Sequence, residues 1–280
     1  MNRFRFSAFA AVALFGVSSV ASAADMAVKA PVMPAAAPYS WTGFYAGANV
    51  GGGWGNQQSS YSPNDPASGV VVNIFHDLVF PDSFKTSGVL GGMQLGYNYQ
   101  FGRSWLIGLE TDFDGTAING SGSTSYASGL EISSAEQRIK WFGTLRARLG
   151  FLPSEKLLGY FTGGFAYGRV EQTSTFATAN GGNIQVNIGG FGVACGSGFP
   201  PTCFAGSSNA MATGWTLGGG LEYAISQMWT IKAEYLYVSL GSKSVTELGT
   251  LNGALAQSSV NANFGRTNFN VARVGFNYRF

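Results

Sequence analysis

Charged side chains recur at every second position along several stretches of this 280-residue chain. Because neighbouring side chains of a β-strand point to opposite faces, this spacing gathers the charges on one face. Six acids and seven bases nearly balance, so ion pairing is the first chemistry that the pattern predicts. The set comprises Glu110, Asp112, Asp114, Glu136, Glu222 and Glu234 with Arg138, Lys140, Arg146, Arg148, Lys232, Arg273 and Arg279.

Two interpretations of this charged face remain open. Buried charges must be paired and hydrogen-bonded, which predicts a structural salt-bridge network. The alternative is a narrow charged pore or gate. If consecutive strands pair as hairpins, Glu110 lies near Arg146 and Glu234 lies near Arg273, and we expect both pairs.

The one histidine, His76, is followed by Asp77, and Ser83 and Ser87 come soon after it. A hydrolase or acyltransferase needs a nucleophile and a base held together, and a haem needs a ligand such as histidine. No Gly-x-Ser-x-Gly turn precedes a helical pattern, so we interpret His76 as a solvated loop residue. The Gly/Ser run at 120–123 lacks the lysine of a phosphate-binding loop. We therefore expect no catalytic residue, no cofactor and no enzymatic activity.

Eight stretches alternate apolar and polar residues with a period of two, which predicts β-strands. In the last stretch, 268–280, one face carries Ala272, Val274, Phe276, Tyr278 and Phe280. Segments that turn apolar residues to lipid and polar residues to a lumen are typical of transmembrane barrels. The other stretches lie near 41–51, 89–101, 105–114, 135–151, 161–167, 215–223 and 229–237.

Long and short connections alternate between these stretches, as in outer-membrane barrels with short periplasmic turns and long external loops. Lipid offers no partner for an unpaired backbone N–H, so the last strand must pair with the first. The sequence therefore predicts an all-β fold, an eight-stranded antiparallel up-and-down transmembrane β-barrel. Its long loops are expected near 56–87, 115–134, 172–212 and 241–266, and its turns near 102–104, 152–156 and 225–228. Interface aromatic girdles are expected from Trp41, Trp105, Trp141, Trp215, Trp229 and Phe280.

Composition and the N-terminus agree with an exported membrane protein. Charged residues make up 11% of the chain, against roughly 25% in soluble domains, and a net charge of +2 gives no reason to expect a nucleic-acid partner. Arg3 and Arg5, a short apolar core and small residues at 21–23 predict a signal peptide over 1–23. Residues 24–40 are rich in Ala and Pro and predict a periplasmic linker, which leaves 41–280 for the barrel.

Cys195 and Cys203 lie close together in the third predicted loop. Export to an oxidising compartment favours a disulfide that closes this loop. Two free thiols are the alternative, and a metal site is disfavoured because no histidine lies nearby in the sequence.

Several motifs together resemble the alphaproteobacterial outer-membrane immunogenic proteins, a family of porin-like small barrels. They are WTGFYAG at 41–47, GYNYQ at 96–100, WFGTLRARLG at 141–150, EYLY at 234–237 and RVGFNYRF at 273–280. The resemblance covers roughly 41–280 and implies an eight-stranded barrel in the outer membrane of a Gram-negative bacterium. It also implies that Phe280 is the aromatic end recognised by the barrel-assembly machinery. Haem binding and host contact are roles of some members, and no motif carries a haem site over to this chain.

We therefore expect a structural and surface-exposed role, in envelope integrity and in contacts made by the loops. The alternative is a porin for passive diffusion of small solutes. Ligand or haem binding through the external loops and a lipid-modifying enzyme are less favoured. The expected partners are outer-membrane lipid and lipopolysaccharide, the assembly machinery, and host or environmental surface ligands.

Overall fold

The computed structural model describes residues 39–79, 83–126, 131–179, 182–251 and 254–280. The predicted signal peptide and nearly all of the predicted linker lie outside these residues. No described helix is long and apolar enough to cross a membrane. The elements are β1 Gly43–Pro63, α1 Pro66–Val79, β2 Ser83–Phe101, β3 Trp105–Tyr126, β4 Glu131–Ser154, β5 Leu157–Thr178, β6 Asn183–Ile188, β7 Phe191–Gly196, β8 Thr202–Ala224, β9 Trp229–Leu240, β10 Lys243–Leu251, β11 Ala254–Phe264 and β12 Thr267–Arg279.

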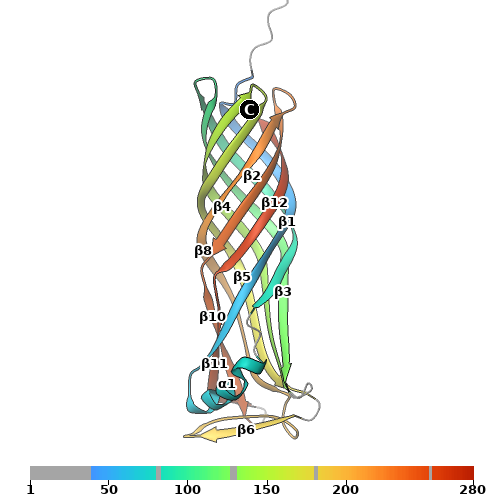
Figure 1. Ribbon diagram of the computed structural model, residues 1–280, viewed down its shortest axis with the longest axis vertical. Helices are drawn as coiled ribbons and strands as arrows, with labels where there is room; N and C mark the ends of the chain where they lie inside the picture. Colours follow the sequence, from blue (N-terminus) through green and yellow to red (C-terminus); the bar gives the residue numbers. More distant parts are fainter. Residues whose placement is uncertain (1–38, 80–82, 127–130, 180–181, 252–253) are drawn as a thin grey trace, which may run out of the picture. The chain divides into compact units, whose positions relative to one another are not determined.

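Eight strands form a closed antiparallel ring in the order β1, β2, β3, β4, β5, β8, β9 and β12 (Figure 1). Closure comes from β12, whose Arg279 pairs with Tyr45 at one end while Phe269 pairs with Gly55 at the other. Every backbone edge of the ring is thereby paired, which lipid requires. The predicted eight-stranded barrel is confirmed.

The two ends of the ring differ in their connections. Tight turns join β2 to β3, β4 to β5 and β8 to β9 at one end, and Gly102 in the first of them has a φ of 64°, which favours glycine. Phe280 lies at this same end, where its N–H donates to the carbonyl of Phe44. We call this the turn end and the opposite end the loop end.

The long connections expected at the loop end are present, and the structure shows that they are folded. Strands β1, β3, β4 and β5 continue through most of them. The hairpin of β10 and β11 takes the place of β9 and β12 in the ring: Phe204 of β8 pairs with Gly249, and Ser60 of β1 pairs with Asn263. We call the described residues within 57–87, 119–138, 171–211 and 241–266 the head.

Within the head, helix α1 is tied to β11 at its first turn. The Asp65 carboxylate accepts hydrogen bonds from the backbone N–H groups of Ser68, at 2.9 Å, and Ser259 of β11, at 2.7 Å. Partial burial opposes ionisation of Asp65, but these hydrogen bonds hold the pKa of its carboxyl below the usual value. An acidic N-cap of this kind satisfies N–H groups that the helix leaves unpaired.

Three clusters of buried apolar side chains fill separate levels of the interior. The head cluster includes Tyr61, Phe84, Phe176, Phe204 and Phe264. The middle cluster contains Leu90, Ile118, Ile139, Phe142, Ala166, Val170, Ala212, Leu236, Val238, Leu240, Phe269 and Val271. The turn-end cluster contains Tyr39, Trp41, Leu106, Leu152, Leu158, Tyr160 and Ala224.

The outer surface of the ring is apolar and bounded by two bands of aromatic contacts. The turn-end girdle comprises Phe44, Tyr97, Trp105, Phe151, Trp229, Tyr278 and Phe280. The loop-end girdle comprises Trp54, Phe113, Trp141, Phe165, Tyr167, Trp215, Tyr235 and Tyr237. Such girdles mark the two interfaces of a membrane. Exposed large apolar side chains lie between them, among them Met93, Leu109, Leu145, Leu217 and Phe276.

Candidate functional site: the buried charge network

Nine charged side chains lie inside the ring, between the turn-end cluster and the middle cluster. Strand alternation places them there, because each faces inward while its sequence neighbours face outward. All nine are at most 4% exposed. They are Glu110, Asp112 and Asp114 of β3, Arg146 and Arg148 of β4, Glu222 of β8, Lys232 and Glu234 of β9, and Arg273 of β12. We call them the charge network.

Arg146 is the centre of the charge network. One of its amino groups contacts the carboxylates of both Glu110 and Asp112, the latter at 2.8 Å. Its other amino group donates to Glu234 at 3.0 Å. The pair of Arg146 with Glu110 is one of the two expected from the sequence.

Arg273 joins the same carboxylates from the opposite wall. Its guanidinium lies 2.6 Å from Asp112 Oδ2, 2.7 Å from Asp114 Oδ2 and 2.6 Å from Glu234 Oε2. The structure thus contains the second expected pair. Guanidinium groups suit this role, since their planar fork engages several carboxylate oxygens at once.

Lys232 and Arg148 complete the compensation of the acids. Lys232 Nζ lies 3.0 Å from Glu110, and Arg148 donates to Glu222 at 2.8 Å. Arg148 also stacks on the ring of Tyr160, with its guanidinium carbon 4.0 Å from the centroid. The Tyr45 hydroxyl donates to Glu110 at 2.6 Å.

Tyr45 and Tyr160 are therefore members of the site that the sequence analysis left out. Both occupy positions on the inward face of the period-two pattern, so the alternation alone could have placed them inside the ring. A phenol carries no charge at neutral pH, so a pattern of charged residues does not include it. Each of these hydroxyls gives the network a donor that carries no charge of its own.

Arg279 lies apart from the charge network, at the turn end. Its guanidinium carbon lies 4.8 Å from the centroid of the Tyr39 ring and 5.8 Å from that of Trp41. Trp41 is fully buried and donates from its indole N–H to the carbonyl of Glu155. The expectation that Trp41 belongs to a lipid-facing girdle was wrong, because residues 39–42 pack against the turn end of the interior instead.

Three residues expected on the inward face point outward. Arg138 pairs with exposed Glu136 at 3.2 Å, and Lys140 pairs with Glu171 at 2.6 Å. The cause is a β-bulge: Ile139 pairs with Val170 and Trp141 with Arg169, which leaves Lys140 as an extra residue in β4. One extra residue exchanges the two faces of a strand, so alternation counted from Arg146 fails beyond it.

The remaining candidate residues fall in the head. Cys195 and Cys203 form the expected disulfide inside the head cluster. His76 lies on α1 rather than in a loop, and its side chain is outside the described residues. Within the described part of the chain, no group of His, Cys, Asp and Glu side chains could hold a metal ion.

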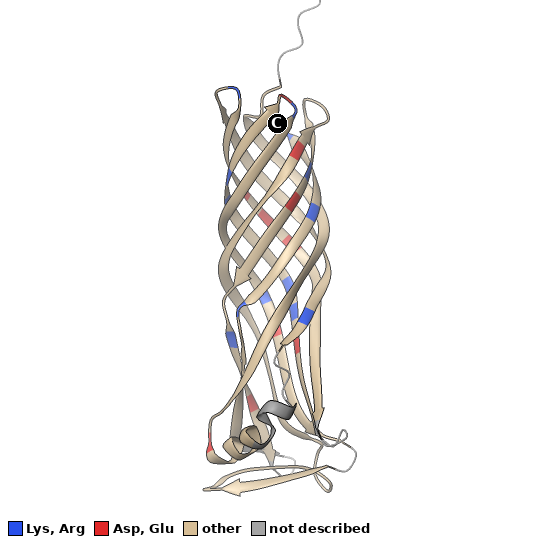
Figure 2. Cartoon of the chain, viewed as in Figure 1, with Lys and Arg blue, Asp and Glu red and all other residues tan. Residues whose placement is uncertain are grey.

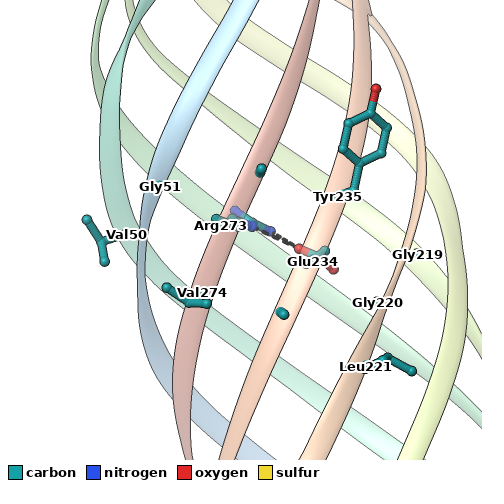
Figure 3. A pocket seen from close by; sticks show the side chains of 11 residues that line it. Val50, Gly51, Gly219, Gly220, Leu221, Glu234, Tyr235, Arg273 and Val274 are labelled. Carbon is teal, nitrogen blue, oxygen red and sulfur yellow. Dashed lines mark hydrogen bonds and ion pairs between the residues drawn. The ribbon is translucent and has the colours of Figure 1, made fainter.

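A shallow groove crosses the lipid-facing surface beside the charge network. Figure 3 shows the ion pair of Arg273 and Glu234 between neighbouring strands at this level, with Val50, Val274 and Leu221 around it. Small residues of β8, β9 and β12 leave the wall thin here.

The relatives found by comparison with known proteins are outer-membrane proteins. The sequence model of the outer membrane protein beta-barrel domain matches residues 8–280. The 31 kDa outer-membrane immunogenic protein of Brucella melitensis is 38% identical over 271 residues, which cover 96% of each chain. The 25 kDa outer-membrane immunogenic protein of the same species is 26% identical over 272 residues, covering 96% of this chain and 94% of that one.

Among solved structures, OprG from Pseudomonas aeruginosa has 12% sequence identity and a TM-score of 0.41, covering 86% of this chain and 97% of that chain. Ail of Yersinia pestis has 14% identity and a TM-score of 0.32, covering 85% and 99%. These likenesses are too low to support an argument about function.

Proposed function

The chain belongs to the outer membrane protein β-barrel family and resides in the outer membrane, and from this premise we propose that it is a closed structural barrel that displays a folded head at the cell surface. Outer-membrane barrels keep their short turns in the periplasm and their long connections outside. The turn end is therefore assigned to the periplasm and the head to the exterior.

The observation that carries the proposal is the filled interior. Glu110, Arg146 and Arg273, like the rest of the charge network, are buried and engaged with opposite charges. Eight strands enclose a space just wide enough for side chains to fill. Apolar clusters lie at the turn end, at the middle and in the head, and each is an apolar layer that an ion would have to cross.

The proposal assigns no catalytic step to the charge network. General acid–base or nucleophilic catalysis needs a group that reaches a substrate. These carboxylates and guanidinium groups face one another inside the ring instead. The head, rather than the lumen, is the part proposed to meet host or environmental ligands, and exposed Phe280 is proposed as the mark read by the assembly machinery.

The alternative is a porin for small solutes, and the experiment must distinguish a porin from a closed barrel. The mature chain, residues 24–280, is refolded, checked for heat-modifiable gel mobility and inserted into a planar bilayer, with an authentic porin as positive control. We expect no steady openings. Steady openings whose size changes in Glu110→Gln, but not in the exposed-pair variant Glu136→Gln, would replace this proposal with the porin.

A further inference from the structure

Strand β6 has one free edge, and it lies at the end of the head farthest from the ring (Figure 1). It pairs with β7 in a two-stranded sheet, and no other strand among the described residues pairs with it. Gly189 and Gly190 join the two strands with φ values of 61° and 88°, which is typical of a two-residue type I′ hairpin turn. The free edge therefore belongs to a strand of a regular hairpin.

The turn determines which backbone groups of β6 reach β7. Ile188 and Phe191 flank the turn, and such a pair exchanges both of its hydrogen bonds. Antiparallel pairs alternate from there, so Val186 and Ile184 also bond to β7. The N–H and C=O groups of the intervening residues point the other way, and they have no hydrogen-bond partner among the described residues. The intervening residues are Asn183, Gln185 and Asn187.

The hairpin is anchored to the rest of the head. Ile184 is buried in the head cluster and pairs with Cys195, whose disulfide to Cys203 ties the hairpin to β8. Val186 packs against the same cluster. Because β6 is already extended and held in place, a strand that docks on its free edge orders little new chain.

The composition of β6 leaves the free edge unprotected. Natural edge strands commonly carry a lysine, a proline or a bulge that prevents pairing with another chain. The stretch Asn183–Ile188 has no charged residue and no proline, as Figure 2 shows for charge, and its pairing with β7 has no bulge. Helix α1 approaches β6, yet Asn183, Gln185 and Asn187 stay exposed. The edge is therefore open to a further strand.

We propose that the free edge of β6 pairs with the free edge of β6 in a second copy of this chain. A two-fold axis at Gln185 sets this residue opposite its own copy and Asn183 opposite Asn187, so the outward backbone groups of both strands bond to one another. On the other face Ile184 lies opposite Val186 of the second copy. A charged strand would repel its own copy in such a pairing, whereas β6 carries no charge.

The contact is small, since a strand of 6 residues buries much less surface than a stable dimer interface. Copies in one outer membrane present their heads on the same side, and this confinement raises their effective concentration. The inference rests on the proposed exposure of the head and names a second copy as one of its partners. Its test does not involve the lumen, so its failure is distinguishable from the failure of the closed barrel.

The test is disulfide cross-linking of the mature chain in proteoliposomes. In Gln185→Cys the two new thiols lie on directly opposite residues with Cα atoms about 5.5 Å apart, which a disulfide can bridge. The matched control Asn187→Cys lies on the same edge and the same face, but its two copies are offset by about 13 Å along the strands. On copper-catalysed oxidation by air, Gln185→Cys should form dimers at least about tenfold faster than Asn187→Cys.

A second pair of variants tests the backbone hydrogen bonds. Gln185→Cys/Asn187→Pro removes an N–H that points away from β7, so the hairpin persists while the free edge loses a donor in each copy. Loss of these two hydrogen bonds should slow dimer formation about tenfold. Gln185→Cys/Asn187→Ala keeps the N–H and should cross-link as fast as Gln185→Cys. Equal rates in the proline and alanine variants would contradict pairing through the backbone.

Three further results would overturn the proposal. One is equal cross-linking of Gln185→Cys and Asn187→Cys, which would show random collision of the heads. Another is the absence of a Gln185→Cys dimer while heat-modifiable mobility and a protease-resistant head show the chain folded. The third is cross-linking to an unrelated extended peptide with one cysteine as fast as to a second copy, which would make β6 a general acceptor of strands.

Discussion

Between the two girdles the barrel carries charged side chains inside and apolar side chains outside, whereas the head carries apolar side chains inside and polar ones outside. The same strands run through both parts. On β5, for example, outward Phe161 and Phe165 give way to outward Thr173, while inward Tyr160 gives way to inward Phe176. The surrounding solvent accounts for the outward change.

The inward change has a different cause. In the head, an apolar side chain gains free energy by leaving water for the interior. Between the girdles it gains little, since lipid tails are as apolar as a protein core. Only polar groups then distinguish the inner face from the outer one. We infer that the charge network specifies which face of each strand turns inward, and that the head cluster supplies stability.

The largest expected effect is in the charge network. Arg146→Ala leaves Glu110, Asp112 and Glu234 short of a buried partner, and we expect a loss of about 5 kcal/mol in the free energy of unfolding. Urea titration in lipid vesicles measures it. The control Arg138→Ala breaks an exposed pair and should cost less than about 1 kcal/mol. Equal losses of unfolding free energy in the two variants would mean that Arg146 does not neutralise buried carboxylates.

The next effect is in the head cluster. Phe204 is fully buried there, and Phe204→Ala should cost about 4 kcal/mol through the cavity that it leaves. Limited proteolysis should cut the head of this variant while the ring keeps its heat-modifiable mobility. Leu217→Ala truncates a lipid-facing side chain of the same strand and should leave the head resistant. Rapid cleavage of the head in both variants would contradict the distinction between a packed head and a lipid-facing ring.

Glu247 gives the head a pH dependence. Glu247 is fully buried, and this burial, offset only in part by a hydrogen bond with Ser174, raises the pKa of its carboxyl to about 7, against 4.5 for the free group. A raised folded pKa stabilises the protonated head below about pH 4.5, and this stability disappears as the pH rises through 7. The loss approaches about 3 kcal/mol.

Proteolysis of the head at pH 5 and pH 9 measures this dependence. The unaltered head should become more susceptible at pH 9. In Glu247→Gln, which keeps the shape and cannot ionise, the difference should disappear. The control Glu136→Gln alters an exposed carboxylate and should retain it. A pH difference that survives in Glu247→Gln would assign the effect to another group.

The smallest effect is expected from the disulfide between Cys195 and Cys203. It closes a short segment between β7 and β8, so its removal should destabilise the head by about 2 to 3 kcal/mol. Reduction of the unaltered chain should accelerate proteolysis of the head and leave the ring intact. The Cys195→Ser/Cys203→Ser variant has no disulfide, so the reductant should not change its proteolysis. Loss of heat-modifiable mobility of the ring on reduction would contradict the separation of the two parts.

Much of the ring could be predicted from the sequence because lipid imposes a strict period of two. Glu110 and Arg146 were expected to pair, and the structure contains that pair. Alternation does not reveal a bulge, however, so the extra residue Lys140 reversed the expected faces of Glu136 and Arg138. Register is a property of two strands, and one strand's sequence does not contain it.

The head could not be predicted for a related reason. Many of its outward residues are Ser, Thr and Asn, and its inward residues include small ones, so the stretches resembled polar loops. Tyr61, Phe84 and Phe264 are the inward aromatic residues that unite it, and they lie far apart in the sequence. The pairing of β1 with β2 on one side and with β11 on the other brings them together.

The central claim is that the head is a packed continuation of the barrel. Hydrogen–deuterium exchange of the mature chain in lipid nanodiscs tests it most directly, since amide protection reports local opening. We predict that amides of β10, β11 and the loop-end half of β3 exchange at least about 100-fold more slowly than unstructured chain. Exchange of these segments at the rate of unstructured chain, with the ring still protected, would show four flexible loops and contradict the account.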